Sequence, residues 1–325
     1  MHALRIGQLS TARINAKLAA CARASSRVRV VAIASRELAR AEAQARDLGV
    51  DTAYGSYEEL LADPAVDAVY ISLPGGMHHA WTMRAIAAGK HVLCEKPYSR
   101  SEADVDEAFE AAERSGLVVA EALMWRHHPQ ALRLAELVAG GAIGELRLVR
   151  AAFRYPLGDP HDIRMREDLA GGALLDVGCY CISAARLLAG EPVSVTAHQV
   201  LTPSGVDARV TATLAHARDV LTAFDCALDL PDRSDLEAVG SEGVLRVSDP
   251  WHSVDTGIDL VRMDGRDDHF DIPPADPYTC QLDDFAGAVA GEHPPRLGRA
   301  DALGQARTID SVLRAATLGE RVTLG

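Results

Sequence analysis

The chain has 325 residues, of which 48% are hydrophobic and 24% are charged, and its formal net charge is −13. A chain of this length can form two domains with well-formed cores, and this composition is typical of globular rather than disordered proteins. The negative charge argues against nucleic acid as a partner, because phosphates would be repelled over the whole surface. A small anionic ligand bound at a local site is still allowed.

The sequence also argues against a membrane protein and against a secreted one. No apolar run reaches the ~20 residues that a membrane span needs. The start of the chain leads directly into a predicted strand and lacks the apolar segment of a secretion signal. The six cysteines include no Cys-x-x-Cys pair, so reduced thiols are the simplest interpretation. We therefore expect a cytoplasmic protein with no membrane partner.

Predicted strands and helices alternate through residues 1–122. The strands are apolar and rich in β-branched residues, as strands buried on both faces should be. This alternation predicts an α/β fold, in which a doubly wound parallel sheet of the Rossmann type forms a dinucleotide-binding domain over residues 1–122. The expected strands are 4–9, 28–34, 52–54, 66–73, 92–94 and 117–122, and the main expected helices are 14–23, 37–48, 77–88 and 102–115.

The pattern changes after residue 122, where strand-like runs follow one another across short polar or glycine turns. Residues 123–325 are therefore expected to form an α+β domain for substrate binding and oligomerisation, with a large open sheet that is mostly antiparallel. Its few helices cannot cover both faces of that sheet, so we expect a homodimer or homotetramer formed through it. The expected strands are 146–155, 194–200, 209–214, 219–225, 236–239, 244–247, 258–263 and 269–272, and the expected helices are 130–139, 277–290 and 300–318.

The turn after the first strand lies where a dinucleotide-binding fold places Gly-x-Gly-x-x-Gly, but Ser10, Ala12 and Asn15 occupy the three glycine positions. Small residues still let a pyrophosphate approach the amides at a helix N-terminus, and hydroxyls add hydrogen-bond donors. A plain strand-to-helix turn is the alternative. The candidates for cofactor binding in this turn are Ser10, Thr11, Ala12, Arg13 and Ile14.

The second strand ends in Ser35-Arg36. A fold that selects NAD usually has an acidic residue near this strand end, which accepts a hydrogen bond from the ribose 2′-hydroxyl. A hydroxyl and a guanidinium suit the 2′-phosphate of NADP better, because arginine presents a planar set of donors to phosphate. NADP is therefore favoured over NAD. The alternative is that Arg36 is only the first exposed residue of the next helix.

Two more loops follow strands at the same predicted edge, because the carboxyl ends of parallel strands meet there. The first loop supplies Leu73, Pro74 and His78 as candidates for cofactor binding. The second begins with Glu95-Lys96-Pro97, in which the proline disfavours the helical conformation at the lysine before it and so keeps that residue extended. Glu95 and Lys96 are thus further cofactor candidates, and Lys96 lies where chemistry is expected. A surface lysine is the alternative.

In the second half, one stretch runs from Asp168 through a glycine pair to Asp-Val-Gly-Cys-Tyr, residues 176–180. Asp176 and Tyr180 are four residues apart in a predicted helix, so their side chains share one face. Gly178 lies between them, where it costs about 1 kcal/mol relative to alanine, which indicates close approach by a backbone or a ligand. The alternative is a surface acid and a packed core tyrosine.

Glu95-Lys96-Pro97, followed by Gly-Gly-Ala-Leu-Leu-Asp176-Val-Gly-Cys-Tyr180, resembles the glucose–fructose oxidoreductase, inositol dehydrogenase and MocA family over nearly the whole chain. The altered first loop and Ser35-Arg36 look most like the NADP-linked aldose (xylose-type) and dihydrodiol dehydrogenases of that family. The resemblance implies hydride transfer between nicotinamide C4 and a carbinol or carbonyl carbon of a sugar or polyol. A common family motif, Pro-Asn-x-x-His, here has Gly75 in place of the asparagine.

The resemblance also implies roles for three residues. Lys96 lies beside the nicotinamide ribose and the reacting oxygen, Asp176 orients substrate hydroxyls, and Tyr180 is the general acid–base. A free tyrosine has a pKa of ~10, so a nearby ammonium and the positive ring of the oxidised cofactor would favour its phenolate. Our hypothesis is that Tyr180 exchanges the proton and Lys96 supports it.

Other side chains are candidates for substrate contacts. Arg164 is favoured because its loop must pass near the helix that carries Asp176, and the others are Arg126, His161 and Tyr278. We predict no metal, because the histidines and acids show no recognisable ligand spacing. The functional alternatives are a trans-dihydrodiol dehydrogenase, a 3-keto-sugar reductase of a biosynthetic pathway and, in another class, an NADP-binding regulator without catalysis.

Overall fold

A computed structural model describes residues 3–324 and divides into two compact units. Unit 1 consists of the chain up to His127 together with Asp276–Leu303, and unit 2 consists of His128–Ala275 together with the chain from Gly304 onward. This division differs from the expected domains 1–122 and 123–325, because a late segment returns to the N-terminal unit. Each unit is described by itself below.

The sheet of unit 1 has six strands in the order β3-β2-β1-β4-β5-β6, and all neighbours are parallel. The predicted doubly wound α/β fold is confirmed. Ser56 and Ser101 cap the helices that follow them, each accepting a hydrogen bond from a backbone amide. The strands are β1 (Leu4–Leu9), β2 (Val28–Ala34), β3 (Thr52–Tyr54), β4 (Ala68–Ile71), β5 (His91–Glu95) and β6 (Val119–Ala122). The helices are α1 (Ile14–Ala24), α2 (Leu38–Leu48), α3 (Tyr57–Ala62), α4 (His78–Ala87) and α5 (Glu102–Arg114).

Helix α8 (Pro277–Val289) is the part of the C-terminal half that belongs to unit 1. It contacts α1 and the short 3₁₀ helix Met124–His127. Leu282 and Phe285 of α8 are fully buried in one hydrophobic cluster with Ile6, Leu18 and Tyr70. Burial of two large apolar side chains accounts for the return of this segment. The sequence pattern predicted the helix but not the unit to which it belongs.

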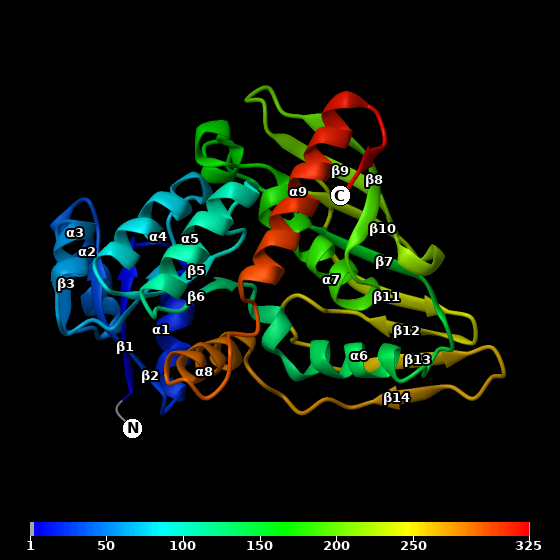
Figure 1. The fold of residues 1–325 in the computed structure, drawn as a ribbon, viewed down its shortest axis with the longest axis horizontal. Coiled ribbons are helices and arrows are strands. Elements are labelled where there is room, and N and C mark those ends of the chain that lie inside the picture. The colour runs from blue at the N-terminus through cyan, green and yellow to red at the C-terminus, as the bar shows by residue number, and fades with distance from the viewer. Residues whose placement is uncertain (1–2, 325) are drawn as a thin grey trace. The chain divides into compact units, whose positions relative to one another are not determined.

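The sheet of unit 2 has nine strands in the order β14-β13-β12-β11-β7-β10-β9-β8-β15. Strands β7 and β10 are parallel and all other neighbours are antiparallel, so the expected mostly antiparallel sheet is confirmed. Helix α7 (Cys179–Ala189) packs on β7 and β10 (Figure 1). The strands are β7 (Leu146–Arg154), β8 (Pro192–Leu201), β9 (Asp207–His216), β10 (Leu221–Ala227), β11 (Arg233–Gly240), β12 (Gly243–Val247), β13 (Ile258–Arg262), β14 (Asp268–Phe270) and β15 (Val322–Thr323), and the other helices are α6 (Pro129–Ala139) and α9 (Arg299–Leu318), the latter beginning in unit 1.

One helical stretch, Glu167–Ala189, has the length and hydropathy of a helix that crosses a membrane. The structure buries 83% of its most apolar window inside the protein. The core helix of a soluble protein has the same properties, so this stretch is weak evidence for a membrane span.

Candidate active site

The loops that follow β1, β2, β4 and β5 lie at one edge of the parallel sheet of unit 1. Leu9 pairs with Ala34 on one side and with Ile71 on the other, and Ile71 pairs with Cys94. The chain leaves these strands at Ser10, Ser35, Ser72 and Lys96. The structure therefore brings together the cofactor candidates of unit 1, as expected for the carboxyl edge of such a sheet.

The turn after β1 has the backbone of a glycine loop at its first position. Ser10 has a φ of 123°, a conformation that glycine adopts much more readily than other residues. Its hydroxyl points inward, 2.8 Å from the Ser72 hydroxyl, and accepts a hydrogen bond from the Ala12 amide. The Ser10 hydroxyl is therefore bonded within the protein, and its contact with phosphate stays a prediction. Thr11 is half-buried, and helix α1 begins at Ile14.

Beyond β2, two arginines lie near Tyr57 of α3. Burial raises the pKa of Tyr57, and the positive charges of Arg36 and Arg40 oppose this shift. Arg40 is absent from the candidates that the sequence suggested, because Arg36 precedes α2 and helix periodicity does not relate the two residues. The two guanidiniums make this strand end suitable for an anionic group.

His78 joins the loop after β4 to the loop after β5. Its Nε2 lies 2.8 Å from the carbonyl oxygen of Leu73, and its Nδ1 lies 2.9 Å from that of Pro97. The ring is buried, which lowers the pKa of His78, while its hydrogen bonds to the two carbonyl groups oppose that shift. The imidazole thus holds the candidate loops at Leu73–Pro74 and Lys96–Pro97 together, as an internal link rather than an exposed ligand group.

Lys96 is half-buried, and its peptide bond to Pro97 is cis. The neighbouring Glu95 carboxylate accepts hydrogen bonds from the Tyr70 hydroxyl and from the Lys96 amide. Tyr278 of α8 belongs to the same group. Burial raises the pKa of Tyr278, the charge of Glu95 raises it further, and the charge of Lys96 lowers it. The structure therefore places the candidate Tyr278 with Lys96 inside unit 1.

In unit 2, the Asp176 carboxylate accepts one hydrogen bond and forms one ion pair. The Tyr155 hydroxyl donates to its Oδ2 at 2.6 Å, and Nε of Arg164 lies 2.9 Å from the same oxygen. Arg164 also pairs with Asp162 at 3.1 Å. Burial lowers the pKa of Arg164, but the interactions with Asp176, Tyr155 and Asp162 together outweigh this effect and raise the pKa of the guanidinium. The expected proximity of Arg164 and Asp176 is confirmed, whereas Tyr155, the last residue of a predicted strand, was missed.

The helix that carries Asp176 begins with a π-helical turn, Leu174–Gly178, before α7. Sequence spacing predicted one continuous α-helix. A Cβ at Gly178 would lie 2.8 Å from Sγ of Cys226 on β10, so this glycine allows close packing of the helix on the sheet. Gly171 likewise allows two segments to pack closely, since a Cβ there would collide with the carbonyl oxygen of Arg164. The predicted close approach is therefore made by the protein itself.

Tyr180 is 6% exposed and lies in an aromatic cluster. Its ring centroid is 5.3 Å from that of Phe153 and 5.9 Å from that of Trp251, both in edge-to-face arrangements. The Trp251 indole donates a hydrogen bond to the Ala152 carbonyl oxygen at 3.0 Å, which fixes the position of the indole in this cluster. The cluster holds the phenol ring in one place with an apolar surface around it.

Two candidates for substrate binding have other environments in the structure. Arg126 pairs with Asp301 at 3.4 Å within unit 1, and its side chain is 11% exposed. His161 is exposed, and its backbone amide donates a hydrogen bond to Oδ1 of Asp159. Over residues 3–324, the structure shows no group of three or more His, Cys, Asp or Glu residues that could hold a metal ion.

The chain matches two family models. Residues 6–123 match an oxidoreductase family with an NAD-binding Rossmann fold, and residues 131–246 match the GFO/IDH/MocA C-terminal domain. D-xylose 1-dehydrogenase (NADP(+)) 2 of Haloferax volcanii is 39% identical over 326 residues, which cover 99% of this chain and 100% of that relative. Human trans-1,2-dihydrobenzene-1,2-diol dehydrogenase is 34% identical over 293 residues, which cover 88% and 85% of the two chains.

Solved structures agree with these relatives. A 3-ketoreductase from Actinomadura kijaniata, in complex with NADP and TDP-benzene, has a TM-score of 0.90 and 32% identity, covering 96% of this chain and 98% of its own. The aldose-aldose oxidoreductase from Caulobacter crescentus, complexed with glycerol, has a TM-score of 0.91 and 26% identity, covering 99% and 100%. The chain therefore belongs to the oxidoreductase family of glucose–fructose oxidoreductase, inositol dehydrogenase and MocA proteins, as its Glu95-Lys96-Pro97 and Asp176-x-x-x-Tyr180 motifs predict.

Proposed function

We propose that this protein is an NADP-dependent oxidoreductase acting on the CH–OH or ketone group of a sugar or related polyol. The observation that carries the proposal is the identity of 39% with an NADP-linked D-xylose dehydrogenase along essentially the whole of both chains. The chain retains an acid–base candidate in Tyr180, a cation in Lys96 and a hydroxyl-binding acid in Asp176. A 3-keto-sugar reductase or a trans-dihydrodiol dehydrogenase is the second candidate, because relatives of both kinds match most of the chain.

The cofactor is NADP, with NAD less favoured. When bound, it supplies hydride exchange at C4 of its nicotinamide ring. Ser35, Arg36 and Arg40 form the end of the site that receives the 2′-phosphate, because two guanidiniums and a hydroxyl match its charge and its acceptor oxygens. The turn from Ser10 to Ile14 and the N-terminus of α1 face the pyrophosphate. The loops at Leu73–Pro74 and Glu95–Lys96, which His78 links, bind the nicotinamide half of the cofactor.

On the substrate side, Tyr180 exchanges the proton of the reacting oxygen, and the charge of Lys96 supports its phenolate. Asp176 accepts hydrogen bonds from substrate hydroxyls in the orientation set by Tyr155 and Arg164. The charges around it sum to −1, since Arg164 is matched by Asp162 and Asp176. Such an environment favours a neutral polyhydroxylated substrate over an anionic one.

The test is a titration of the purified protein with NADPH and NADH, followed by absorbance of the reduced nicotinamide on a panel of aldoses, keto-sugars and cyclic diols. We expect turnover that prefers NADP and that is abolished in Lys96→Ala and Tyr180→Phe. Tyr54→Phe is the matched control, because Tyr54 bonds to Asp63 at the far edge strand β3. NADPH binding without turnover on any substrate would support the alternative of a non-catalytic regulator.

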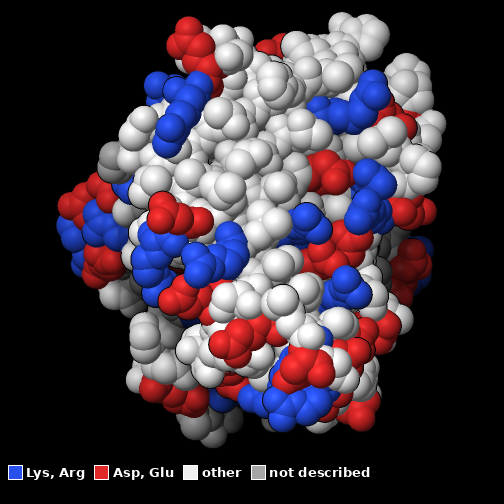
Figure 2. Space-filling model, turned by 90° about the vertical axis from the view of Figure 1, so that its right-hand side faces the viewer, with Lys and Arg blue, Asp and Glu red and all other residues white. Residues whose placement is uncertain are grey.

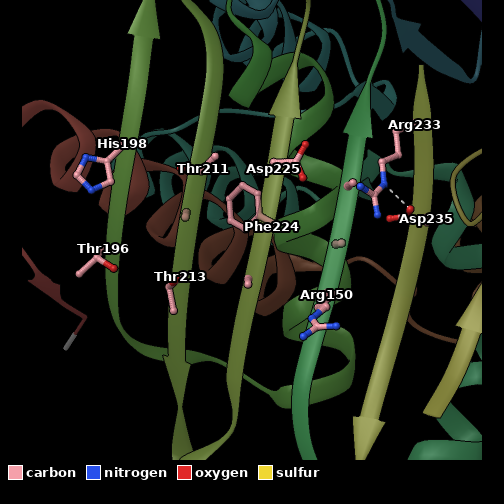
Figure 3. A pocket seen from close by; sticks show the side chains of 13 residues that line it. Arg150, Thr196, His198, Thr211, Thr213, Phe224, Asp225, Arg233 and Asp235 are labelled. Atoms are coloured by element: carbon pink, nitrogen blue, oxygen red, sulfur yellow. Dashed lines mark hydrogen bonds and ion pairs between the residues drawn. The ribbon is translucent and has the colours of Figure 1, made fainter. Parts of the chain in front are cut away.

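We further propose a homodimer or homotetramer through the sheet of unit 2. One face of the sheet carries α7, while a hollow on the sheet is lined by threonines and alanines together with His198, Phe224 and charged side chains of both signs (Figure 3). Register places two rows side by side across the strands: Thr196, Thr213, Ala223 and Arg150, and then His198, Thr211, Asp225, Ala152 and Asp235.

Charges of both signs on this face favour a second copy of the chain as its partner. Arg150 and Arg233 lie among Asp225 and Asp235, and a two-fold axis can place each sign opposite the other. The molecular face in Figure 2 likewise mixes Lys and Arg with Asp and Glu instead of presenting one sign. Light scattering should give a mass of at least twice 34.6 kDa, and a pair of substitutions to glutamate at Thr196 and Thr213 should reduce it to one chain. A monomeric wild type would contradict the proposal.

A further inference from the structure

A connected set of hydrogen bonds holds the turn after β1 where other dinucleotide-binding folds use glycines. The Ser10 hydroxyl lies 2.8 Å from the Ser72 hydroxyl, which donates to Oδ1 of Asn15 at 2.7 Å. Nδ2 of Asn15 donates to the Ser10 carbonyl oxygen at 2.8 Å and to Oε1 of Gln44 at 3.0 Å. Nε2 of Gln44 donates to the Ala12 carbonyl oxygen at 3.3 Å.

These bonds form one consistent chain of donors and acceptors. The Ala12 amide donates to the Ser10 hydroxyl, this hydroxyl donates to Ser72, and Ser72 donates to Asn15. Asn15 is fully buried and uses its one oxygen and both amide hydrogens. Hydrogen bonds that run in one direction strengthen one another in a buried environment. The set therefore compensates for the glycine-like φ of Ser10 and fixes the path of the turn.

Gln44 is the member of the set that lies on α2, as Ser72 is the member that follows β4. Helix α2 follows the Ser35-Arg36 strand end and carries Arg40. Both amide atoms of Gln44 bond to the turn after β1 or to Asn15, near the start of α1. Gln44 thus ties the arginine end of the proposed cofactor site to the turn proposed to face the pyrophosphate.

We propose that Gln44 is a positioning residue that fixes the spacing between the 2′-phosphate site and the pyrophosphate turn, in a loop that lacks its glycines. This inference rests on the proposed function, because it assumes that NADP binds at these two places. A tether that holds both ends at the correct distance favours ligands that span them, since less conformational freedom is lost on binding. A ligand that reaches only the arginine end gains nothing from the tether.

The experiment compares Gln44→Ala with the wild type in titrations with NADPH, which spans both ends, and with 2′-AMP, which occupies only the arginine end. We expect the variant to bind NADPH about tenfold more weakly and 2′-AMP with a change of less than about twofold, as for a coupling between two sites. The kcat at saturating NADPH should stay within about twofold of wild type, because a residue that positions the cofactor stabilises the ground state and the transition state equally.

Ala43→Gly is the matched control. Ala43 is the exposed neighbour of Gln44 on α2, so this change loosens the helix but leaves the hydrogen bonds in place. It should bind both ligands like the wild type. Equal losses of affinity for NADPH and 2′-AMP in Gln44→Ala would contradict the proposed role of Gln44. The same loss of NADPH affinity in Ala43→Gly would contradict it as well. A wild type that binds neither ligand would overturn the cofactor assignment itself, which separates the two failures.

Discussion

Tyr155 and Asp176 are joined by a hydrogen bond of 2.6 Å between a phenol and a carboxylate that come from different elements of unit 2. Tyr155 follows β7, and Asp176 lies in the π-helical turn before α7. The same carboxylate oxygen forms an ion pair with Arg164, whose Nε lies 2.9 Å away. Asp176 is therefore oriented from two sides, and its partners should matter for substrate binding as much as the acid itself.

Tyr155→Phe removes one donor and leaves the ring. A hydrogen bond to a charged group contributes about 1.5–3 kcal/mol, so kcat/KM for the preferred sugar should fall about tenfold to a hundredfold. Steady-state kinetics with the best substrate of the panel measure this. The Kd of NADPH should not change, because Tyr155 belongs to unit 2 and the cofactor candidates to unit 1. An unchanged kcat/KM would show that Asp176 needs no support from the phenol.

Arg36 and Arg40 should together determine cofactor preference. Arg36→Ala and Arg40→Ala should each weaken NADPH binding about tenfold or more, since each removes a charge-assisted contact to phosphate. NADH has no 2′-phosphate, so its Kd should change by less than about threefold. Fluorescence titration of both reduced cofactors measures the two effects. A parallel loss for NADH would mean that these arginines support the fold near Tyr57 instead of selecting the phosphate.

Bound cofactor should protect Lys96 from amine reagents. The chain has three lysines, and Lys17, which is exposed and pairs with Asp276, serves as the internal control. Treatment with pyridoxal phosphate and borohydride, followed by peptide mass spectrometry, measures the labelling of each lysine. Saturating NADPH should slow the labelling of Lys96 and leave that of Lys17 unchanged. Labelling of Lys96 at the same rate with and without cofactor would contradict its place in the cofactor site.

Asp207 should make unit 2 less stable as the pH rises from about 4 to about 6. Burial raises the pKa of Asp207 from its ordinary value of 3.8 to about 6, although its carboxylate accepts the Leu174 amide at 2.6 Å. Because the folded state holds the proton more tightly, the stabilisation is complete below pH 3.8 and is lost through pH 6, by at most about 3 kcal/mol.

The measurement is the melting temperature between pH 4 and pH 7.5 for the wild type and Asp207→Asn. The asparagine keeps an acceptor for Leu174 and cannot ionise, so the variant should lack this part of the pH dependence. Its melting temperature relative to the wild type should therefore rise between about pH 4 and about pH 6. Identical pH profiles for the two proteins would show that Asp207 does not titrate in this range.

Local patterns in the chain were enough to predict the two kinds of sheet and the edge where cofactor candidates gather. The second strand was expected at 28–34 and is observed as β2 at Val28–Ala34, because an apolar β-branched run has few other stable arrangements. Ser10, Ser35 and Lys96 were located by the same logic, since each directly follows a buried strand of a parallel sheet. Periodicity and strand ends are local properties of the chain, and they can be read without a structure.

The contacts between distant side chains became visible only in the folded protein. Tyr155 with Asp176, Gln44 with Asn15, and α8 with the core of unit 1 are contacts between segments separated by many residues. The glycine at 178 suggested a place for a ligand until the structure placed Cys226 against it. Such contacts depend on strand order, on register and on the direction of each side chain. These are set by the packing of the whole unit and leave no periodic signal in the sequence.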